Sequence, residues 1–399
     1  MTAPWLHVVG IGEDGLAGLA EPALAALRRA EVIIGGDRHH DLSDGVSAER
    51  RCWPSPFDAM IDEIRSLRER KPVVLVTGDP LWYSVGARLL REIDAAEIVF
   101  HPQLSAFQWA ACRMGWSLAD CATATVHGRP IGQVVLHFAP RRRILLLTQG
   151  AETPAAVARL LRERGYGTSR MTVLGALGGP DETRIDGTAN GWNEDAPPFH
   201  TLAIDCIAEA GARRLPSTGL PDDAFEHDGQ MTKQDVRAAT IARLAPFPHG
   251  VLWDIGSGCG SVAIEWMRAA PEARAVGIEP DAGRRAMATR NAEALGVPRL
   301  RLVNGRAPSA LDDLPSPDAV FIGGGLTTEG VFERCWEALE PGGHLVANAV
   351  TLESEARLAA LHAHHGGTLV RIAVSHAIAV GPYRGWRPAM PVTQWSVVR

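Results

Sequence analysis

The sequence predicts an α/β protein built from two domains. Short apolar runs alternate with segments that carry apolar residues at helical spacing, the pattern of sheets covered by helices. The 399 residues exceed the usual size of one hydrophobic core, which favours two domains. A glycine-rich turn at residues 251–260 joins a predicted buried strand to a predicted helix, and a small ligand can approach the backbone at such a turn.

The turn in VLWDIGSGCG combines three glycines with the start of a helix. Residues 251–255 form the short apolar run of a central parallel strand, and residues 261–267 restart with helical spacing. Gly256, Gly258 and Gly260 permit backbone angles closed to other residues, and the helix offers free N–H groups and the positive end of its dipole. We therefore expect this turn to cradle a cofactor.

The spacing of the glycines selects among cofactors. A dinucleotide site reads G-x-G-x-x-G or A, whereas here Gly260 comes one residue early and Ser261 stands at the last position. The run D-x-G-x-G-x-G from Asp254 instead resembles motif I of the S-adenosylmethionine-dependent methyltransferases with a Rossmann-like fold. Glu279 follows the apolar run 275–278, where an acidic side chain can accept both ribose hydroxyl protons. A glycine turn without a ligand is the alternative interpretation.

Composition and charge disfavour several classes of protein. The hydrophobic fraction of 46% and the charged fraction of 22% are those of a globular protein, and no apolar run approaches a membrane span. The N-terminus lacks a secretory signal, so we expect a cytoplasmic protein. Six scattered cysteines without a C-x-x-C pair suggest neither a zinc site nor disulfides. A net charge of −6 disfavours nucleic acid as a partner, and we expect no metal, no membrane partner and a homo-oligomer.

The predicted domain boundary lies where the periodic spacing of apolar residues stops. Residues 209–220 contain several helix breakers, so we predict domains at 1–208 and 221–399 joined by a linker. Thr232, with Asp235 three positions later, is the expected N-cap of a helix in the second domain. Its expected buried face carries Val236, Ala239, Ile241 and Leu244.

Strands and helices are predicted along both halves. The expected helices of the first half are residues 21–29, 58–70, 84–92 and 153–164. The stretch between the last two strands of that half is expected to be a hairpin or a loop. The expected strands are residues 5–9, 32–34, 72–76, 143–147, 171–177 and 201–207, then 251–255, 275–278, 300–303, 319–322 and 344–348.

Three short motifs in the first half resemble the tetrapyrrole methylase family. They are VVGIGEDGL at residues 8–16, TGDPLWYSVG at 77–86 and HPQLSAFQWAACRMGW at 101–116. The family usually has Pro in place of Glu13 and Gly in place of Gln103. The resemblance implies a two-lobed domain that binds S-adenosylmethionine, and an ordinary Gly-Asp-Pro turn is the alternative. The cofactor candidates of this domain are Gly78, Asp79, Ser105 and Ala106.

The motifs of the second half, in their order behind the first three, resemble a family of fused decarboxylating precorrin methyltransferases of cobalamin (vitamin B12) biosynthesis. These motifs are MTKQDVR, WDIGSGCGSVAIEW, NGRAP, PDAVFIGGG and PGGHLVANAVTLESE. The resemblance implies a two-lobed tetrapyrrole methylase fold followed by a Rossmann-like methyltransferase fold. The cofactor candidates of the second domain are Thr232, Asp254, Gly256, Ser257, Gly258, Cys259, Gly260, Glu279, Arg306 and Ala307.

The same resemblance implies a reaction. It is the S-adenosylmethionine-dependent methylation of a precorrin-6 tetrapyrrole at carbons 5 and 15, with loss of carbon dioxide from the acetate on ring C. In the family, the C-terminal half is associated with carbon 15 and the decarboxylation, and the N-terminal half with carbon 5. One S-adenosylmethionine site is therefore expected per domain.

The substrate candidates follow from the chemistry of a flat ring with many carboxylates. Glycines leave room beside a macrocycle, and arginines bind carboxylates through two N–H groups. A flexible glycine loop and a solvent-exposed arginine loop are the alternatives. The candidates are Gly323, Gly324, Gly325, Asn348, Arg384 and Arg387, with residues 38–40 as a weaker set in the first domain.

Two other functions remain open on the sequence alone. The C-terminal motifs also occur in transfer-RNA adenine methyltransferases, although a basic stripe for RNA is missing. The N-terminal half is alternatively a non-catalytic module that binds substrate, because Glu13 and Gln103 depart from the family pattern.

Overall fold

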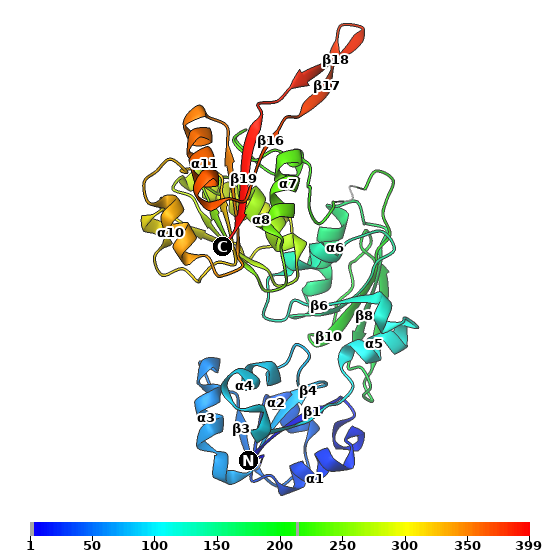
Figure 1. The fold of residues 1–399 in the computed structure, drawn as a ribbon. Coiled ribbons are helices and arrows are strands. Elements are labelled where there is room, and N and C mark those ends of the chain that lie inside the picture. Colours follow the sequence, from blue (N-terminus) through cyan, green and yellow to red (C-terminus); the bar gives the residue numbers. More distant parts are fainter. Residues whose placement is uncertain (1–3, 213–214) are drawn as a thin grey trace. The chain divides into compact units, whose positions relative to one another are not determined.

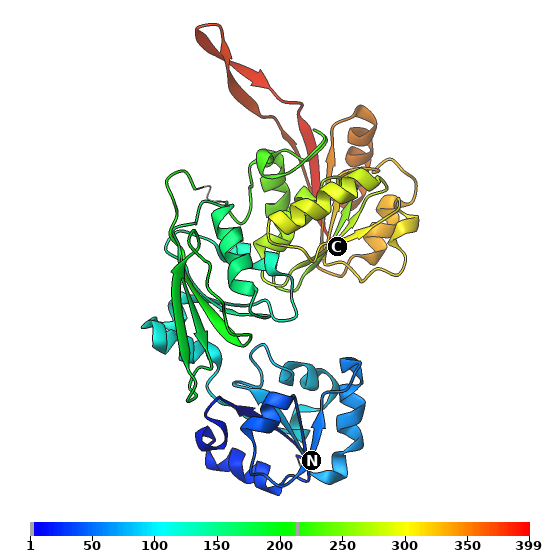
Figure 2. The same ribbon diagram turned by 180° about the vertical axis from the view of Figure 1, so that it is seen from behind.

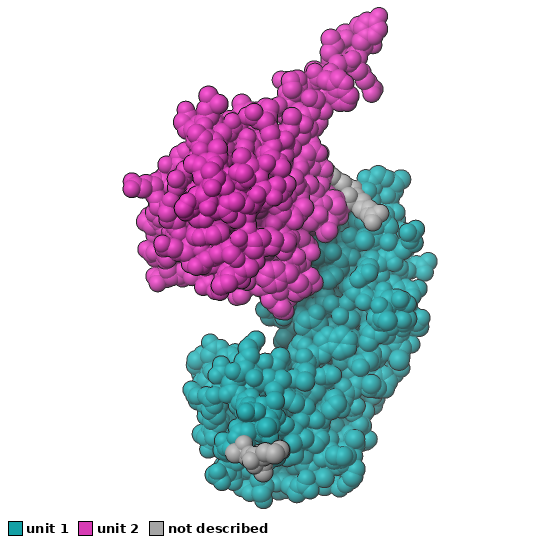
Figure 3. All heavy atoms as spheres, in the orientation of Figure 1, with its two compact units in different colours: residues 1–213 teal, residues 214–399 magenta. Residues whose placement is uncertain are grey.

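A computed structural model describes residues 4–212 and 215–399. The chain forms two compact units, residues 1–213 and 214–399 (Figure 3). The division falls inside the stretch 209–220. At one end of that stretch, the Glu209 N–H donates to the Gly165 carbonyl at 2.8 Å within unit 1. At the other end, the Gly219 and Leu220 N–H groups donate to Glu265 within unit 2, so each end of the stretch is bound to one of the two units.

The first lobe of unit 1 is a parallel five-stranded sheet in the order β3-β2-β4-β1-β5 (Figure 1). The strands β1, β2 and β4 are apolar runs because both faces are covered, by α1 on one side and by α3 and α4 on the other. The elements are β1 (Leu6–Ile11), α1 (Glu21–Arg29), β2 (Val32–Gly35), α2 (Asp37–Leu42), β3 (Glu49–Cys52), α3 (Met60–Ser66), β4 (Pro72–Thr77), α4 (Gly86–Glu92) and β5 (Ile98–His101).

The second lobe of unit 1 is a mixed five-stranded sheet in the order β6-β7-β10-β8-β9, covered by α5 on one face and α6 on the other (Figure 2). β9 forms an antiparallel hairpin with β8 in the stretch predicted to be a hairpin or loop, and none of its residues is buried. The elements are α5 (Ala106–Met114), β6 (Cys121–Thr125), β7 (Arg143–Leu147), α6 (Thr153–Arg162), β8 (Arg170–Gly175), β9 (Thr183–Thr188) and β10 (His200–Asp205).

Unit 2 is a doubly wound sheet of seven strands in the order β13-β12-β11-β14-β15-β19-β16 (Figure 1). The first five strands are parallel, and β19 runs antiparallel to both of its neighbours. Side chains alternate between two cores: Leu252 and Phe321 pack under α7 to α9, whereas Trp253 and Ile322 pack under α10 and α11. The predicted α/β fold class is thereby confirmed. Among the described residues, no helix is long and apolar enough to span a membrane.

The elements of unit 2 follow in chain order. The helices are α7 (Gln234–Leu244), α8 (Ser261–Ala269), α9 (Ala282–Ala294), α10 (Val331–Ala338) and α11 (Leu352–His365). The strands are β11 (Val251–Ile255), β12 (Arg274–Ile278), β13 (Arg301–Val303), β14 (Ala319–Ile322), β15 (His344–Ala349), β16 (Thr368–Ile372), β17 (Ser375–Val380), β18 (Tyr383–Pro388) and β19 (Val392–Val398).

Two local predictions were wrong. Residues 58–70 are not one helix, because α3 spans only Met60–Ser66 between two short 3₁₀ turns. Thr232 does not cap α7: the helix begins one residue later, with Lys233 at the N-cap. The Arg237 guanidinium donates to the Thr232 carbonyl and holds it outside the helix. Arg237 lies on α7 and is fully buried, although the spacing of apolar residues did not place it on the buried face.

Arg237 and Glu265 form a buried ion pair that holds the segment before α7 against α8 in unit 2. Both side chains are fully buried, and Arg237 Nε lies 2.6 Å from Glu265 Oε1. The carboxylate also accepts the Gly219 and Leu220 N–H groups at 2.6 and 2.9 Å. The guanidinium reaches Asp222 at 3.1 Å. The pair therefore binds the segment before α7 to α8.

Replacing Arg237 by Met should destabilise unit 2 by about 3–5 kcal/mol, because Glu265 would keep a buried charge without a cationic partner. Denaturant unfolding followed by tryptophan fluorescence measures this change. The double variant Arg237→Met with Glu265→Leu should recover much of the loss, since it removes both charges. An unfolding midpoint of Arg237→Met equal to that of the wild type would contradict the role of the pair.

Candidate functional site

A cavity of about 1700 Å³ opens in unit 2 at the carboxyl ends of the parallel strands. Its wall consists of the turns after β11, β13 and β14, the ends of β12 and β15, the segment 228–236 and the base of the β17–β18 hairpin. Ligands of doubly wound sheets bind at this edge. The volume exceeds the roughly 300–1,000 Å³ of a site for one small ligand, so the cavity has room for two.

The glycine turn after β11 is shaped by contact with a second glycine turn. Gly256 and Gly258 have φ of 74° and 58°, a left-handed conformation that favours glycine. A Cβ on Gly256 would lie 3.1 Å from the Gly324 backbone nitrogen in the turn after β14. A side chain at Gly256 would therefore force the two turns apart, and both turns present bare backbone to the cavity.

Asp254 joins β11, the glycine turn and α8 through one buried carboxylate. Its Oδ2 accepts the Ser257 hydroxyl at 2.9 Å and the Ala263 N–H at 3.2 Å. Gly277 leaves room for Ser257, because a Cβ there would lie 2.7 Å from the Ser257 Oγ. Burial raises the pKa of Asp254 to about 6, and the charge of Glu279 adds to this rise. Asp254 Oδ1 is buried without a hydrogen-bond partner among the described residues.

Glu279 follows β12 directly and lies on the cavity wall, and only 4% of the residue is exposed to solvent. Oε2 accepts the Gly258 N–H at 3.0 Å and Oε1 accepts the Asp281 N–H at 2.9 Å. Each oxygen has two lone pairs, so each retains one for a ligand. The hydrogen bond from the Gly258 N–H to Glu279 also holds the glycine turn against the end of β12.

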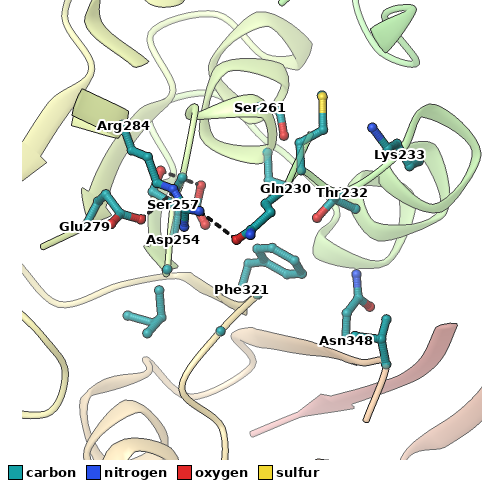
Figure 4. A pocket seen from close by; sticks show the side chains of 18 of the residues that line it. Gln230, Thr232, Lys233, Asp254, Ser257, Ser261, Glu279, Arg284, Phe321 and Asn348 are labelled. Atoms are coloured by element: carbon teal, nitrogen blue, oxygen red, sulfur yellow. Dashed lines mark hydrogen bonds between the residues drawn. The ribbon is translucent and has the colours of Figure 1, made fainter. Parts of the chain in front are cut away.

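The polar groups of the cavity lie in two clusters, separated by Phe321 (Figure 4). Glu279 and Arg284 lie in one cluster, where Arg284 donates to Asp228 at 2.9 Å and to Gln230. Lys233 and Asn348 lie at the other end, near Thr232. The glycine cradle and the unpartnered Asp254 oxygen fit a small cationic cofactor at the first cluster, and the second cluster is left for another ligand.

Most predicted residues of unit 2 lie on the cavity wall, but four do not. Cys259 is buried in the turn, and its carbonyl accepts the Asn291 amide at 3.0 Å. Gly260 lies outside the cavity wall and precedes α8. Arg384 and Arg387 lie on the exposed strand β18, outside the cavity wall, and their contact with a substrate stays a prediction. The predicted residues on the wall are Thr232, Asp254, Gly256, Ser257, Gly258, Glu279, Arg306, Ala307, Gly323, Gly324, Gly325 and Asn348.

The structure adds Lys233 to the predicted set. Lys233 lies on the cavity wall and makes no ion pair with any described residue, and the same holds for Arg306. Lys233 is one of two lysines in the sequence and stands next to Thr232 in MTKQDVR, a signal that could have found it. Two unpaired cations therefore face the cavity in place of the predicted pair on β18. In the described part of the chain, no group of three or more His, Cys, Asp or Glu residues could hold a metal ion.

The predicted residues of unit 1 meet at the carboxyl edge of the first sheet. A Cβ on Gly10 would lie 1.8 Å from the Gly78 carbonyl oxygen, so the end of β1 and the turn after β4 are in contact. Gly78 has φ of 64°, and a Cβ on it would lie 2.8 Å from the Ser105 Cα. Asp79 accepts the Leu81 N–H at 2.7 Å, and Ala106 begins α5. The end of β1, the turn after β4 and the segment before α5 thus converge at one place.

The two departures from the family pattern are both accommodated by contacts. Glu13 forms an ion pair with Arg38, whose guanidinium carbon lies 3.8 Å from the centre of the Phe199 ring. Gln103 donates to the Gly18 carbonyl. Arg38, a weaker substrate candidate, is thus already paired, and burial lowers the pKa of the neighbouring His39 to about 4.

The glycine cradle, the acidic residue at the end of β12 and the doubly wound sheet define a methyltransferase domain, joined to a two-lobed α/β unit. Family profiles agree. A profile described as tetrapyrrole (corrin/porphyrin) methylases matches residues 5–191, and one described as precorrin methyltransferase domain matches residues 223–399. A relative from Sinorhizobium sp., precorrin-6Y C(5,15)-methyltransferase [decarboxylating], is 47% identical over 99% of this chain and 97% of its own. The chain belongs to the family of these decarboxylating precorrin methyltransferases, and S-adenosylmethionine is the methyl donor of this family.

Two shorter relatives each match part of the chain. A cobalt-precorrin-7 C(5)-methyltransferase from Salmonella typhimurium is 31% identical over 43% of this chain and 83% of its own. A probable cobalt-precorrin-6B C(15)-methyltransferase (decarboxylating) from Pyrobaculum calidifontis is 40% identical over 34% of this chain and 72% of its own. Proteins named for one carbon thus occur as separate chains.

Asp254 predicts a pH dependence of cofactor binding. Because burial raises its pKa to about 6, the carboxyl group is partly protonated near that pH in the free protein. A nearby cation such as a sulfonium favours the carboxylate, so affinity should rise from about pH 5 to pH 7 and binding should release protons near pH 6. Calorimetry in buffers of different ionisation enthalpy measures the release.

The matched control for that experiment is Asp254→Asn, which should lose the proton release of the unit 2 site. The difference between wild type and variant separates this site from any other in the chain. Equal heats in all buffers for the wild type would contradict a titrating Asp254.

Proposed function

We propose that this chain methylates a precorrin at carbons 5 and 15 and removes the carboxyl group of its ring C acetate, in cobalamin biosynthesis. The observation that carries the proposal is the unit 2 cavity, in which a cofactor cradle opens into a space large enough for a second, bulky ligand. The names of the full-length relative and of the two shorter relatives support the substrate and both carbons. Membership in this family argues against the transfer-RNA alternative.

We infer that unit 2 binds S-adenosylmethionine at the first cluster. Bound there, it would supply an electrophilic methyl group on a sulfonium. Glu279 would accept the ribose hydroxyls through its remaining lone pairs, and the Gly256 and Gly258 backbone would lie against the ligand. Arg306 and Ala307, on the turn after β13, complete this side of the wall.

The second cluster would bind the tetrapyrrole. A precorrin carries many carboxylates, and Lys233, as an unpaired cation on the wall, would attract them. Gly323 to Gly325 leave a wall without side chains, against which a flat ring can lie. Asn348 adds an amide at the end of β15.

These residues act mainly by alignment. Methyl transfer is an in-line displacement, and holding two reactants in register can supply about 7–11 kcal/mol of the barrier lowering. Decarboxylation releases carbon dioxide from the acetate, leaves its electron pair in the conjugated ring and requires a proton at the product carbon. The chain's part in that step is to hold the acetate in one orientation, with Lys233 and Asn348 at the end of the cavity where we place the ring.

We further propose a second S-adenosylmethionine site in unit 1, at the turns that bring together Gly78, Asp79, Ser105 and Ala106. Carbon 5 is assigned to this unit and carbon 15 to unit 2. The existence of separate relatives named for each carbon, which match 43% and 34% of this chain, supports two catalytic units. A non-catalytic unit 1 is the competing arrangement.

Separating the units should give two folded fragments with one cofactor site each. The fragments 1–212 and 215–399 preserve the described contacts on both sides of the division, including those of Gly219 and Leu220. Calorimetry with S-adenosylmethionine should give one site per fragment and two in the intact chain. A folded 1–212 fragment that binds none would establish unit 1 as a non-catalytic module.

Replacing Glu279 by Ala should weaken cofactor binding at unit 2 by about 30- to 1,000-fold, because two hydrogen bonds to a charged group are lost and water replaces them in part. Methylation at carbon 15 and decarboxylation should stall together, while carbon 5 methylation continues. Calorimetry on the 215–399 fragment and mass analysis of the product measure these effects.

Glu293→Ala is the control for Glu279→Ala, since Glu293 is an exposed glutamate on α9 outside the cavity. It should leave both cofactor affinity and product unchanged. A folded Glu279→Ala fragment with wild-type affinity would refute the assignment of Glu279.

A further inference from the structure

Three polar side chains from distant parts of unit 2 meet at Asn348, at the substrate end of the cavity. Thr240 on α7 and Gln394 on β19 are both fully buried, and Asn348 on β15 lies on the cavity wall. The Asn348 amide nitrogen donates to Thr240 Oγ1 at 3.2 Å. The Gln394 amide nitrogen donates to Thr240 Oγ1 at 3.0 Å and to Asn348 Oδ1 at 2.9 Å.

The direction of each bond is fixed by a backbone carbonyl. The Thr240 hydroxyl donates its single hydrogen to the Val236 carbonyl at 2.8 Å, so its oxygen can only accept from the two amides. Gln394 must therefore turn its NH₂ group toward Thr240, and this NH₂ group also reaches Asn348 Oδ1. The Asn348 amide is held in one orientation, in which one Nδ2 hydrogen goes to Thr240 and the second is left for the cavity.

Stability does not account for Gln394. Its Oε1 is buried without a hydrogen-bond partner among the described residues, which is unfavourable for a polar atom. An apolar side chain of similar shape, such as Met, would avoid the unpartnered oxygen at this position. Gln394 lies directly opposite Asn348 in the antiparallel pair of β15 and β19, where its amide reaches the Asn348 oxygen.

We propose that Gln394 and Thr240 are positioning residues that hold the Asn348 amide as a hydrogen-bond donor to a carboxylate of the substrate. The inverted amide would present its oxygen to the cavity and repel a carboxylate, so the network selects an anionic ligand at this end. Lys233 lies on the same side of Phe321 as Asn348 and adds a positive charge to the wall of the same cavity (Figure 4). The proposal rests on the proposed binding of a precorrin in unit 2.

The test compares variants of the full chain with precorrin-6 as substrate. Gln394→Met and Thr240→Val should each raise the KM for the precorrin, or its Kd, by about 10- to 100-fold, because Asn348 loses its fixed orientation. S-adenosylmethionine affinity should stay at the wild-type value, and the unfolding midpoint of Gln394→Met should be equal or higher. Thr240→Ser retains the hydroxyl and should keep the KM and Kd for the precorrin at their wild-type values. Asn348→Asp replaces the donor by an anion and should weaken precorrin binding most.

Thr289→Val is the matched control for Thr240→Val. Thr289 also donates its hydroxyl to the carbonyl four residues earlier in a helix, at 3.1 Å, but it lies outside the cavity. It should leave precorrin affinity unchanged.

Two results would overturn the proposal. One is a Gln394→Met variant with wild-type precorrin affinity and turnover. The other is a parallel loss of precorrin affinity, cofactor affinity and stability, which would show that the network only supports the fold. A wild-type chain that binds the precorrin without converting it would overturn the proposed function instead. The precorrin Kd of Gln394→Met, compared with that of the wild type, would then test the role of Gln394. A wild-type chain that does not bind the precorrin would overturn both.

Discussion

The buried carboxylate of Asp254 is the interaction on which the unit 2 site depends. It joins the end of β11 to Ser257 in the glycine turn and to Ala263 in α8, so strand, turn and helix keep one relative position. Burial makes this arrangement costly, as the raised pKa of the carboxyl group indicates. A turn designed only for stability would not need a buried carboxylate with one unpartnered oxygen. The cost is consistent with a site prepared for a cationic ligand.

Helix α7 supports one end of the cavity, near Thr232 and Asn348, through its buried polar side chains. Arg237 binds Glu265 and fastens the segment that precedes the helix, including the Thr232 carbonyl. Thr240, one turn later, fixes the amides of Asn348 and Gln394. The same helix therefore positions both the Thr232 backbone and the Asn348 amide at the substrate end of the cavity. Its weakly apolar pattern reflects these buried polar residues rather than a surface position.

Unit 1 achieves a similar convergence with a different fold. The end of β1 and the turns after β4 and β5 approach so closely that only glycine fits at Gly10 and Gly78. The departures at Glu13 and Gln103 are compatible with this close approach. Glu13 forms an ion pair with Arg38, and Gln103 donates to the Gly18 carbonyl. Whether a residue matches a family motif and whether its loop keeps its shape are separate questions.

The sequence by itself determined the α/β class, the glycine turn and the acidic end of β12. These features are local: a strand followed by Gly256 and Gly258 needs left-handed backbone angles, and Glu279 follows its own strand directly. Only the tertiary structure decided which cations face the cavity, since Arg384 and Arg387 share a motif but lie on an exposed strand. It also revealed Gln394, which contacts Thr240 across 154 positions of the chain. Such contacts depend on how strands and helices pack, and residue spacing along the chain carries no information about them.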